Sequence, residues 1–115
     1  MPEITPENLD LLKKLQPLFK RELGEWKIGD RYCYISYPKG VLTVLQLSML
    51  PVDSNIILRI PTLEELWEMV DWDKHHFYLE TCHGTVDIYI DGEVLCAECD
   101  PYTALLKALC SQEEV

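Results

Sequence analysis

A stripe of hydrophobic residues at helical spacing opens the chain. Thr5-Pro6-Glu7 has the composition of an N-cap followed by a first helical turn, with an acid that suits the helix dipole. Pro17 lies inside the stripe and predicts a kink or a broken pair of helices, and Gly24 predicts the helix end. The apolar positions of the stripe are Leu11, Leu12, Leu15, Leu18 and Phe19.

Two further helices are marked by their first residues. Thr62 and Glu65 have the spacing of a capping box, and we expect this helix to end near Asp71. Its apolar face comprises Leu63, Leu66, Trp67 and Val70. Asp100-Pro101 predicts the cap and first turn of a final helix. The inward-facing positions of that helix are Leu105, Leu106 and Leu109.

The segment between the first two helices changes to a strand pattern. Residues 32–37 are aromatic and β-prone, and Pro38-Lys39-Gly40 predicts a turn. Residues 41–47 are apolar on both alternating faces, which indicates a strand covered on both sides, with a short helix as the alternative. We expect a loop over residues 51–55 and another strand over residues 55–60.

The last third of the chain predicts a three-strand meander over residues 77–82, 85–90 and 93–99. His83-Gly84 and Asp91-Gly92 form two-residue turns, and the second is a strong type I′ signal. The predicted fold class is therefore α+β, with a mostly antiparallel sheet whose C-terminal three-strand meander packs against about three helices.

Two-residue turns also predict which residues of the meander face each other. Glu80 then faces Asp87, Leu79 and Leu95 face Ile88, Asp87 faces Cys96, and Val86 faces Ala97. The expected core face carries Phe77, Leu79, Thr81, Val86, Ile88, Ile90, Leu95, Ala97 and Cys99. The expected polar face carries Tyr78, Glu80, Cys82, Thr85, Asp87, Tyr89, Val94, Cys96 and Glu98.

This register bears on the Cys96-Ala97-Glu98-Cys99 motif, which with Cys82-His83 resembles a zinc ligand set. Residues three apart on a regular strand point to opposite faces, and Cys82 would lie two strands away, about 10 Å from Cys96. Redox motifs of this spacing lie at helix N-termini, which only Cys99 adjoins. We therefore expect five thiols, no metal, no cofactor and no disulfide, unless a knuckle forms at the strand end.

The polar face holds the more distinctive group of side chains. Glu80 and Asp87 should lie directly opposite, with Tyr78 and Tyr89 on the next rung. Opposed like charges destabilise a sheet, and one carboxyl pKa should rise unless a cation lies between them. Paired carboxylates can perform acid–base chemistry, and a solvated polar face is the alternative. The His75-His76 pair is interpreted as exposed loop histidines rather than ligands.

Composition narrows the class of protein. The chain has 115 residues, 48% of them hydrophobic, which suits a single domain over residues 1–115. It has no signal-peptide pattern and no apolar run of membrane-spanning length, so we expect a cytoplasmic protein. The net charge is −10, which disfavours nucleic-acid binding. Residues 1–40 hold seven bases and six acids, whereas residues 41–115 hold three bases and fourteen acids.

Two segments support a resemblance to known proteins. Residues 60–66, IPTLEEL, open a short helix, and residues 99–109, CDPYTALLKAL, open the last one. In order of elements, roughly residues 55–110 resemble small α/β sandwich proteins encoded by bacteriophages and prophages. The resemblance implies a compact sandwich and transfers no functional residue.

Three functions remain open on this basis. The first is a non-enzymatic interaction protein of phage or bacterial origin, favoured because no nucleophile elbow, P-loop or dinucleotide motif is present. The second is an acidic inhibitor that mimics nucleic acid or blocks a basic host protein, and the third is a small hydrolase using paired carboxylates. The candidate binding residues are Tyr32, Tyr34, Tyr78, Glu80, Asp87 and Tyr89.

We predict self-association as a twofold dimer through the near-neutral first 40 residues. The 32–37 segment supplies aromatics of the kind enriched at interfaces, and screening beyond about 8 Å weakens the repulsion between acidic copies. Light scattering in 0.15 M salt should give a dimer mass that Tyr34→Ala combined with Ile35→Ala reduces. A monomer mass over an about tenfold concentration range contradicts the dimer, and a dimer indifferent to the variant contradicts its location.

Overall fold

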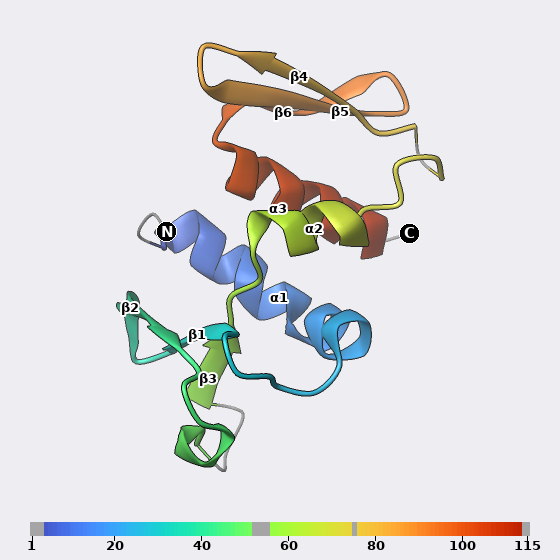
Figure 1. Ribbon diagram of the computed structural model, residues 1–115. Helices are drawn as coiled ribbons and strands as arrows, with labels where there is room; N and C mark the ends of the chain where they lie inside the picture. Colours follow the sequence, from blue (N-terminus) through green and yellow to red (C-terminus); the bar gives the residue numbers. More distant parts are fainter. Residues whose placement is uncertain (1–3, 52–55, 75, 114–115) are drawn as a thin grey trace. The chain divides into compact units, whose positions relative to one another are not determined.

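Three α-helices and two antiparallel sheets form from residues 4–51, 56–74 and 76–113, which the computed structural model describes (Figure 1). This confirms the predicted α+β class. The chain divides into an N-terminal unit, Met1–Pro61, and a C-terminal unit, Thr62–Val115. No helix among the described residues combines the length and hydropathy of a membrane span. The residues of the expected loop at 52–55, and His75, lie outside the described part.

Helix α1, Pro6–Leu23, begins and ends where the sequence predicts. The Thr5 hydroxyl accepts the Asn8 N–H at 3.1 Å, and Gly24 ends the helix with φ +72°. Pro17 does not break α1 into two helices, although Figure 1 shows the helix axis changing direction in its second half. The buried stripe of α1 is Leu12, Leu15, Leu18 and Phe19.

The sheet of the N-terminal unit has the order β2-β1-β3. Its strands are β1, Arg31–Tyr34, β2, Tyr37–Thr43, and β3, Ile57–Arg59, and the 3₁₀ helix η1, Leu47–Met49, follows β2. The turn lies at Ile35-Ser36, so the prediction of a turn at Pro38-Lys39-Gly40 is wrong. Those residues lie within edge strand β2, where the register with β1 shifts and a proline costs no ladder bond.

The helices of the C-terminal unit confirm their predicted caps. α2, Leu63–Met69, has the complete capping box of Thr62 and Glu65. α3, Pro101–Glu113, begins with the Asp100 carboxylate accepting the Tyr102 N–H at 3.0 Å. α3 packs against α2 and against two strands of the meander. Its Ala104, Leu105, Leu106, Ala108 and Leu109 are almost completely buried.

The meander has the strands that the sequence predicts, β4, Tyr78–Cys82, β5, Thr85–Ile90, and β6, Glu93–Cys99. Both residues of each turn have positive φ, as type I′ turns require: His83, Gly84, Asp91 and Gly92. The pairing of β4 with β5 is regular and puts Glu80 opposite Asp87, which confirms that part of the register.

The second half of β6 departs from the predicted register. Val94 faces Tyr89 as expected, but Cys96 then faces Ile88 and Cys99 faces Val86. Strand β6 therefore holds one extra residue beside Ile88 and another before Cys99, which makes two bulges. The predicted pairs Ile88–Leu95, Asp87–Cys96 and Val86–Ala97 are wrong for this reason.

The predicted core face of the meander is confirmed on β5 and is wrong on β6. Phe77, Val86 and Ile88 are buried as predicted, whereas Ala97 is exposed and Cys96 is only 5% exposed. Thr81, expected on the core face, is also exposed. Because of the bulges, Cys96 rather than Ala97 packs against the core.

We predict that Ile88→Ala costs about 2–5 kcal/mol of unfolding free energy, because Ile88 is fully buried at the centre of the sheet. Tyr89→Ala on the opposite face is the matched control and should cost much less. Urea unfolding of both variants measures the difference. Equal losses would contradict the assignment of the two faces.

Candidate functional site

The aromatic residues expected to form an interface in the N-terminal unit lie largely in its core. Tyr32 is only 7% exposed and packs with Val44 and Ile57. Tyr34 is half-buried, with its ring centroid 6.0 Å from that of Tyr32. Trp26 meets Tyr32 edge-on at 6.1 Å. Tyr32 therefore packs behind Trp26 and Ile57, two residues that line a cavity, and offers little binding surface of its own.

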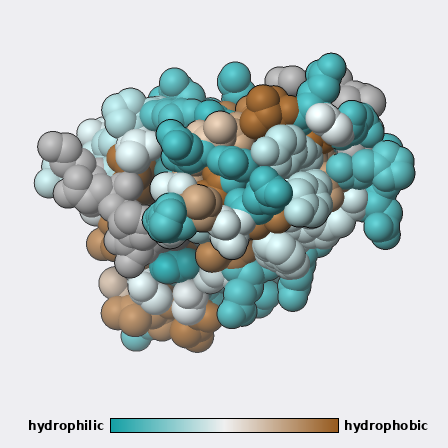
Figure 2. Space-filling model, turned by 90° about the horizontal axis from the view of Figure 1, so that it is seen from above, coloured by the Kyte–Doolittle hydropathy of each residue, from teal (hydrophilic) through white to brown (hydrophobic). Residues whose placement is uncertain are grey.

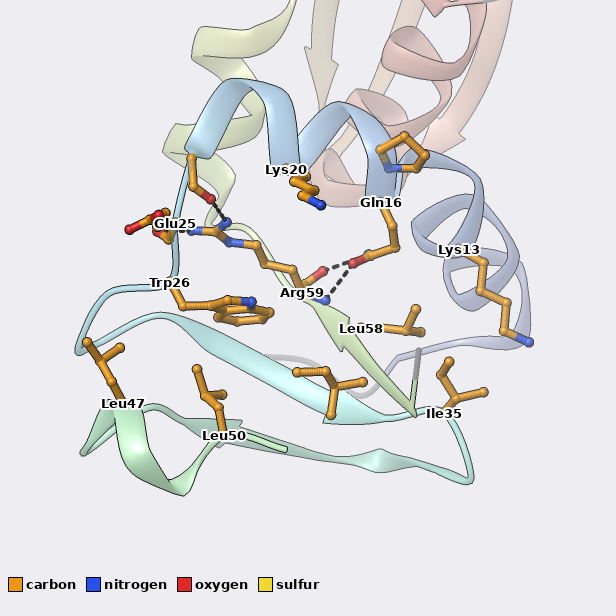
Figure 3. A pocket seen from close by; sticks show the side chains of 13 residues that line it. Lys13, Gln16, Lys20, Glu25, Trp26, Ile35, Leu47, Leu50, Leu58 and Arg59 are labelled. Carbon is orange, nitrogen blue, oxygen red and sulfur yellow. Dashed lines mark hydrogen bonds between the residues drawn. The ribbon is translucent and has the colours of Figure 1, made fainter. Parts of the chain in front are cut away.

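That cavity is a groove of about 1030 Å³ between α1, β3, η1 and the chain that follows α1 (Figure 3). Helix α1 contributes the polar side, with Lys13, Gln16 and Lys20. The apolar side comprises Trp26, Ile35, Leu47, Leu50, Ile57 and Leu58. We call this cavity the groove from here on.

Gln16 attaches α1 to the free edge of β3. Its side-chain oxygen accepts the Arg59 N–H at 2.8 Å, and its amide nitrogen donates to the Arg59 carbonyl at 3.1 Å. The same nitrogen lies 3.0 Å from the Leu12 carbonyl. The amide thus satisfies backbone groups that an edge strand leaves unpaired, and it holds the polar wall of the groove in place.

Arg59 fixes the inner end of the groove. Its guanidinium is almost completely buried and donates to the Gly24 carbonyl at 2.7 Å and to an Asp30 carboxylate oxygen at 2.8 Å. It also lies over the Trp26 ring, 4.8 Å from the centroid. Because Asp30 and two main-chain carbonyls use this charge, Arg59 is a structural residue rather than a free anion receptor.

Lys13 and Lys20 are the groove's remaining cations. Both are exposed, and no ion pair to either is found among the described residues. With Gln16 they occupy positions i, i+3 and i+7 of α1, which share one helix face. Figure 3 shows both side chains on the α1 side of the groove. No sequence pattern marks this group, because lysines on a helix are common and the apolar wall comes from distant segments.

Four predicted site residues do lie together, on the outer face of the meander. The Tyr78 and Tyr89 ring centroids are 6.0 Å apart, and the Tyr89 hydroxyl donates to Glu80 at 3.4 Å. Asp87 accepts the backbone N–H of Glu98 at 2.7 Å. The Glu80 charge, with smaller contributions from burial and from Asp87, raises the pKa of the Tyr89 phenol.

Acidity dominates the unit that carries this face. The C-terminal unit holds two bases and thirteen acids, a net charge of −11, against +1 for the N-terminal unit. Figure 2, seen from the side on which Figure 1 draws the meander, shows mainly hydrophilic residues between smaller hydrophobic patches. We call Tyr78, Glu80, Asp87 and Tyr89 the tyrosine–acid face.

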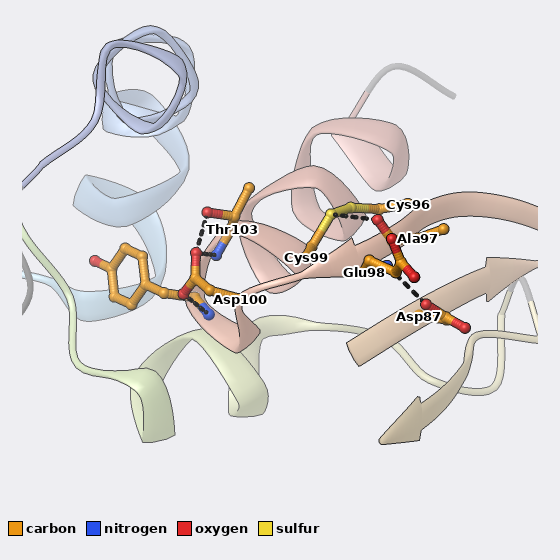
Figure 4. The surroundings of a disulfide bond; sticks show 8 residues. Asp87, Cys96, Ala97, Glu98, Cys99, Asp100 and Thr103 are labelled. Carbon is orange, nitrogen blue, oxygen red and sulfur yellow. Dashed lines mark hydrogen bonds between the residues drawn. A yellow bond between two sulfur atoms is a disulfide. The ribbon is translucent and has the colours of Figure 1, made fainter. Parts of the chain in front are cut away.

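The expectation of five thiols is wrong, because Cys96 and Cys99 form a disulfide (Figure 4). The bulge between them adds one residue, so both cysteines face the core side of the sheet and their Cα atoms lie 6.4 Å apart. Cys33, Cys82 and Cys110 are not part of a disulfide. Burial raises the pKa of the Cys33 thiol. No cluster of three His, Cys, Asp or Glu side chains able to hold a metal occurs among the described residues.

No protein-family model, curated protein or solved structure matches the chain.

We predict that Glu80→Gln lowers the pKa of Tyr89 towards the ordinary tyrosine value of about 10, because Glu80 is the main cause of its elevation. In the unchanged protein the Tyr89 phenol should ionise at higher pH than in the variant. An NMR titration, with Tyr89→Phe to assign the signal, measures this. Glu93→Gln, which removes another exposed acid, is the control, and an equal shift in both variants would contradict the assignment.

Proposed function

We propose that the chain is a non-enzymatic interaction protein whose groove binds an acidic, amphipathic helix of a partner protein. The observation that carries this proposal is one groove that combines an apolar wall with two lysines on a single helix face. Binding of this kind uses apolar anchors for affinity and charge for orientation.

The size and lining of the groove favour a segment of protein over a small metabolite. Its volume of about 1030 Å³ lies at the upper end of the range for small-molecule sites, about 300–1,000 Å³. The apolar wall includes Leu47, which is 52% exposed. An apolar helix face can cover such a surface with several side chains at once.

The spacing of the lysines favours an occupant with two negative charges. Seven residues of helix span about 10 Å, so Lys13 and Lys20 lie two helical turns apart on one face of α1. Two acids that are two turns apart on a partner helix can contact both. The other polar side chains of the groove are Gln16 and Arg59, which are already hydrogen-bonded within the fold, and the exposed acid Glu25, which lies at the Arg59 end.

The chain's charge of −10 opposes an acidic partner at long range. Exposed charges are screened beyond about 8 Å in physiological salt, so the charges next to the partner decide the outcome. Those charges belong to the N-terminal unit, whose net charge is +1. We therefore expect modest affinity that depends on Lys13 and Lys20.

The tyrosine–acid face supports a second candidate function, the binding of a basic partner. Its two tyrosine rings lie beside Glu80 on a unit with a net charge of −11. Aromatic faces and carboxylates together attract arginine and lysine side chains. This candidate is the acidic inhibitor that the sequence also suggests, directed at a protein.

We predict that Lys20→Glu weakens binding of a designed acidic helical peptide about fivefold to tenfold, which corresponds to about 1–1.4 kcal/mol. The probe peptide carries leucines on one face and glutamates seven residues apart beside it. Fluorescence anisotropy of the labelled peptide measures binding. Lys14→Glu is the matched control, because Lys14 is an exposed residue of α1 that does not line the groove.

A second pair of variants tests the apolar wall in the same assay. Leu47→Asp should abolish binding, whereas Leu45→Asp, at an exposed position outside the lining, should not. Equal effects within either pair, or no binding of the peptide, would contradict the proposal. Preferred binding of a lysine-rich peptide that Glu80→Gln weakens and Lys20→Glu does not would favour the second candidate.

A further inference from the structure

Two registers of β6 are compatible with the same hairpin turn. In the observed register the turn is followed by the pairs Ile90–Glu93 and Tyr89–Val94, and two bulges then bring Cys96 opposite Ile88 and Cys99 opposite Val86. A regular ladder from the same turn brings Leu95 opposite Ile88 and Ala97 opposite Val86. The turn itself is unchanged between the two.

The regular register offers a good apolar fit to the core. It would turn Leu95 and Ala97 towards Ile88 and Val86, which are buried, whereas Ala97 is exposed and Leu95 half-buried in the observed register. It does not require α3 to move, because Glu98 and Cys99 would then link Ala97 to Asp100, the N-cap of α3.

Only the bulged register permits the disulfide. Cys96 and Cys99 are three residues apart, so a regular strand points them to opposite faces. The bulge that places Glu98 at φ +54° brings both onto the core face. Asp87 supports this arrangement by accepting the Glu98 N–H at 2.7 Å. The S–S bond and the regular ladder therefore exclude each other.

We propose that Cys96–Cys99 is a thiol–disulfide exchange site for dithiol reductants, and that its redox state selects the register of β6. This inference is independent of the groove. Oxidised protein holds the bulged register, and reduced protein adopts the regular one, with Cys96 on the outer face opposite Asp87.

The exchange is a two-electron reaction. A thiolate of the dithiol attacks the Cys99 sulfur, which is the more accessible because Cys99 is half-buried and Cys96 is 5% exposed. The Cys96–Cys99 bond breaks, Cys96 leaves as a thiolate that takes up a proton, and a mixed disulfide forms at Cys99. The second thiol of the same reductant molecule then displaces Cys99, which takes up a proton, and this gives two protein thiols and the intramolecular disulfide of the reductant.

The register change alters the tyrosine–acid face. In the oxidised form the Glu98 N–H occupies one oxygen of Asp87, and Cys96 lies against the core (Figure 4). In the reduced form Cys96 joins Asp87 on the outer face. The reduced protein thus presents a new exposed thiol beside the Asp87 carboxylate.

Alkylation of the native protein tests the proposal. Without reductant, iodoacetamide should label at most Cys33, Cys82 and Cys110. After treatment with dithiothreitol, Cys96 should react about tenfold or more faster than the buried Cys33, as measured by mass spectrometry of the peptides. NMR contacts between Ile88 and Leu95 should replace those between Ile88 and Cys96.

The controls separate a register change from simple loss of the bond. Cys96→Ser combined with Cys99→Ser should show the Ile88–Leu95 contacts without reductant, and Cys82→Ser should leave the redox response unchanged. Reduced protein in which Cys96 stays as protected as Cys33, with its Ile88 contacts intact, would overturn the proposal. Alkylation of Cys96 and Cys99 in protein that has not been treated with reductant would show that the disulfide is absent, and it would overturn the proposal as well.

Discussion

The buried guanidinium of Arg59 connects the parts from which the groove is built. It holds the carbonyl that ends α1 at Gly24, the loop carboxylate of Asp30 and the face of Trp26. A buried charge of this kind is stable only while all its partners stay in place, and removal of one typically costs about 3–5 kcal/mol. The mutual position of α1, β3 and the intervening loop therefore depends on this single side chain.

The groove is a consequence of that constraint. Because Arg59 and Gln16 satisfy their hydrogen bonds within the fold, the space between α1 and η1 keeps an apolar wall, and the charged groups left to interact with an occupant are Lys13, Lys20 and Glu25. The division of charge between the units has a parallel effect. The C-terminal unit has a net charge of −11 and the N-terminal unit one of +1, so the two units attract partners of different charge.

The meander illustrates how little separates two arrangements of a strand. Its turns are local and strong, yet β6 carries two bulges that exchange Leu95 and Ala97 for Cys96 and Cys99 opposite the buried residues of β5. Each bulge disrupts one step of the ladder, and the disulfide and the Asp87–Glu98 hydrogen bond offset that loss. The Cys96–Cys99 disulfide is thereby coupled to the bulged register of β6.

Interactions within a few residues were readable from the sequence alone, including the caps at Thr5, Thr62 and Asp100 and the Asp91-Gly92 turn. Tertiary structure decided the rest. Tyr32 became core because Val44 and Ile57 pack against it, and the disulfide formed because a bulge shifts the alternation of β6. The groove, too, joins Lys13, Trp26, Leu47 and Arg59 from four separate segments. No local sequence pattern predicts this grouping, because the four segments come together only when the chain folds and Arg59 forms its buried interactions.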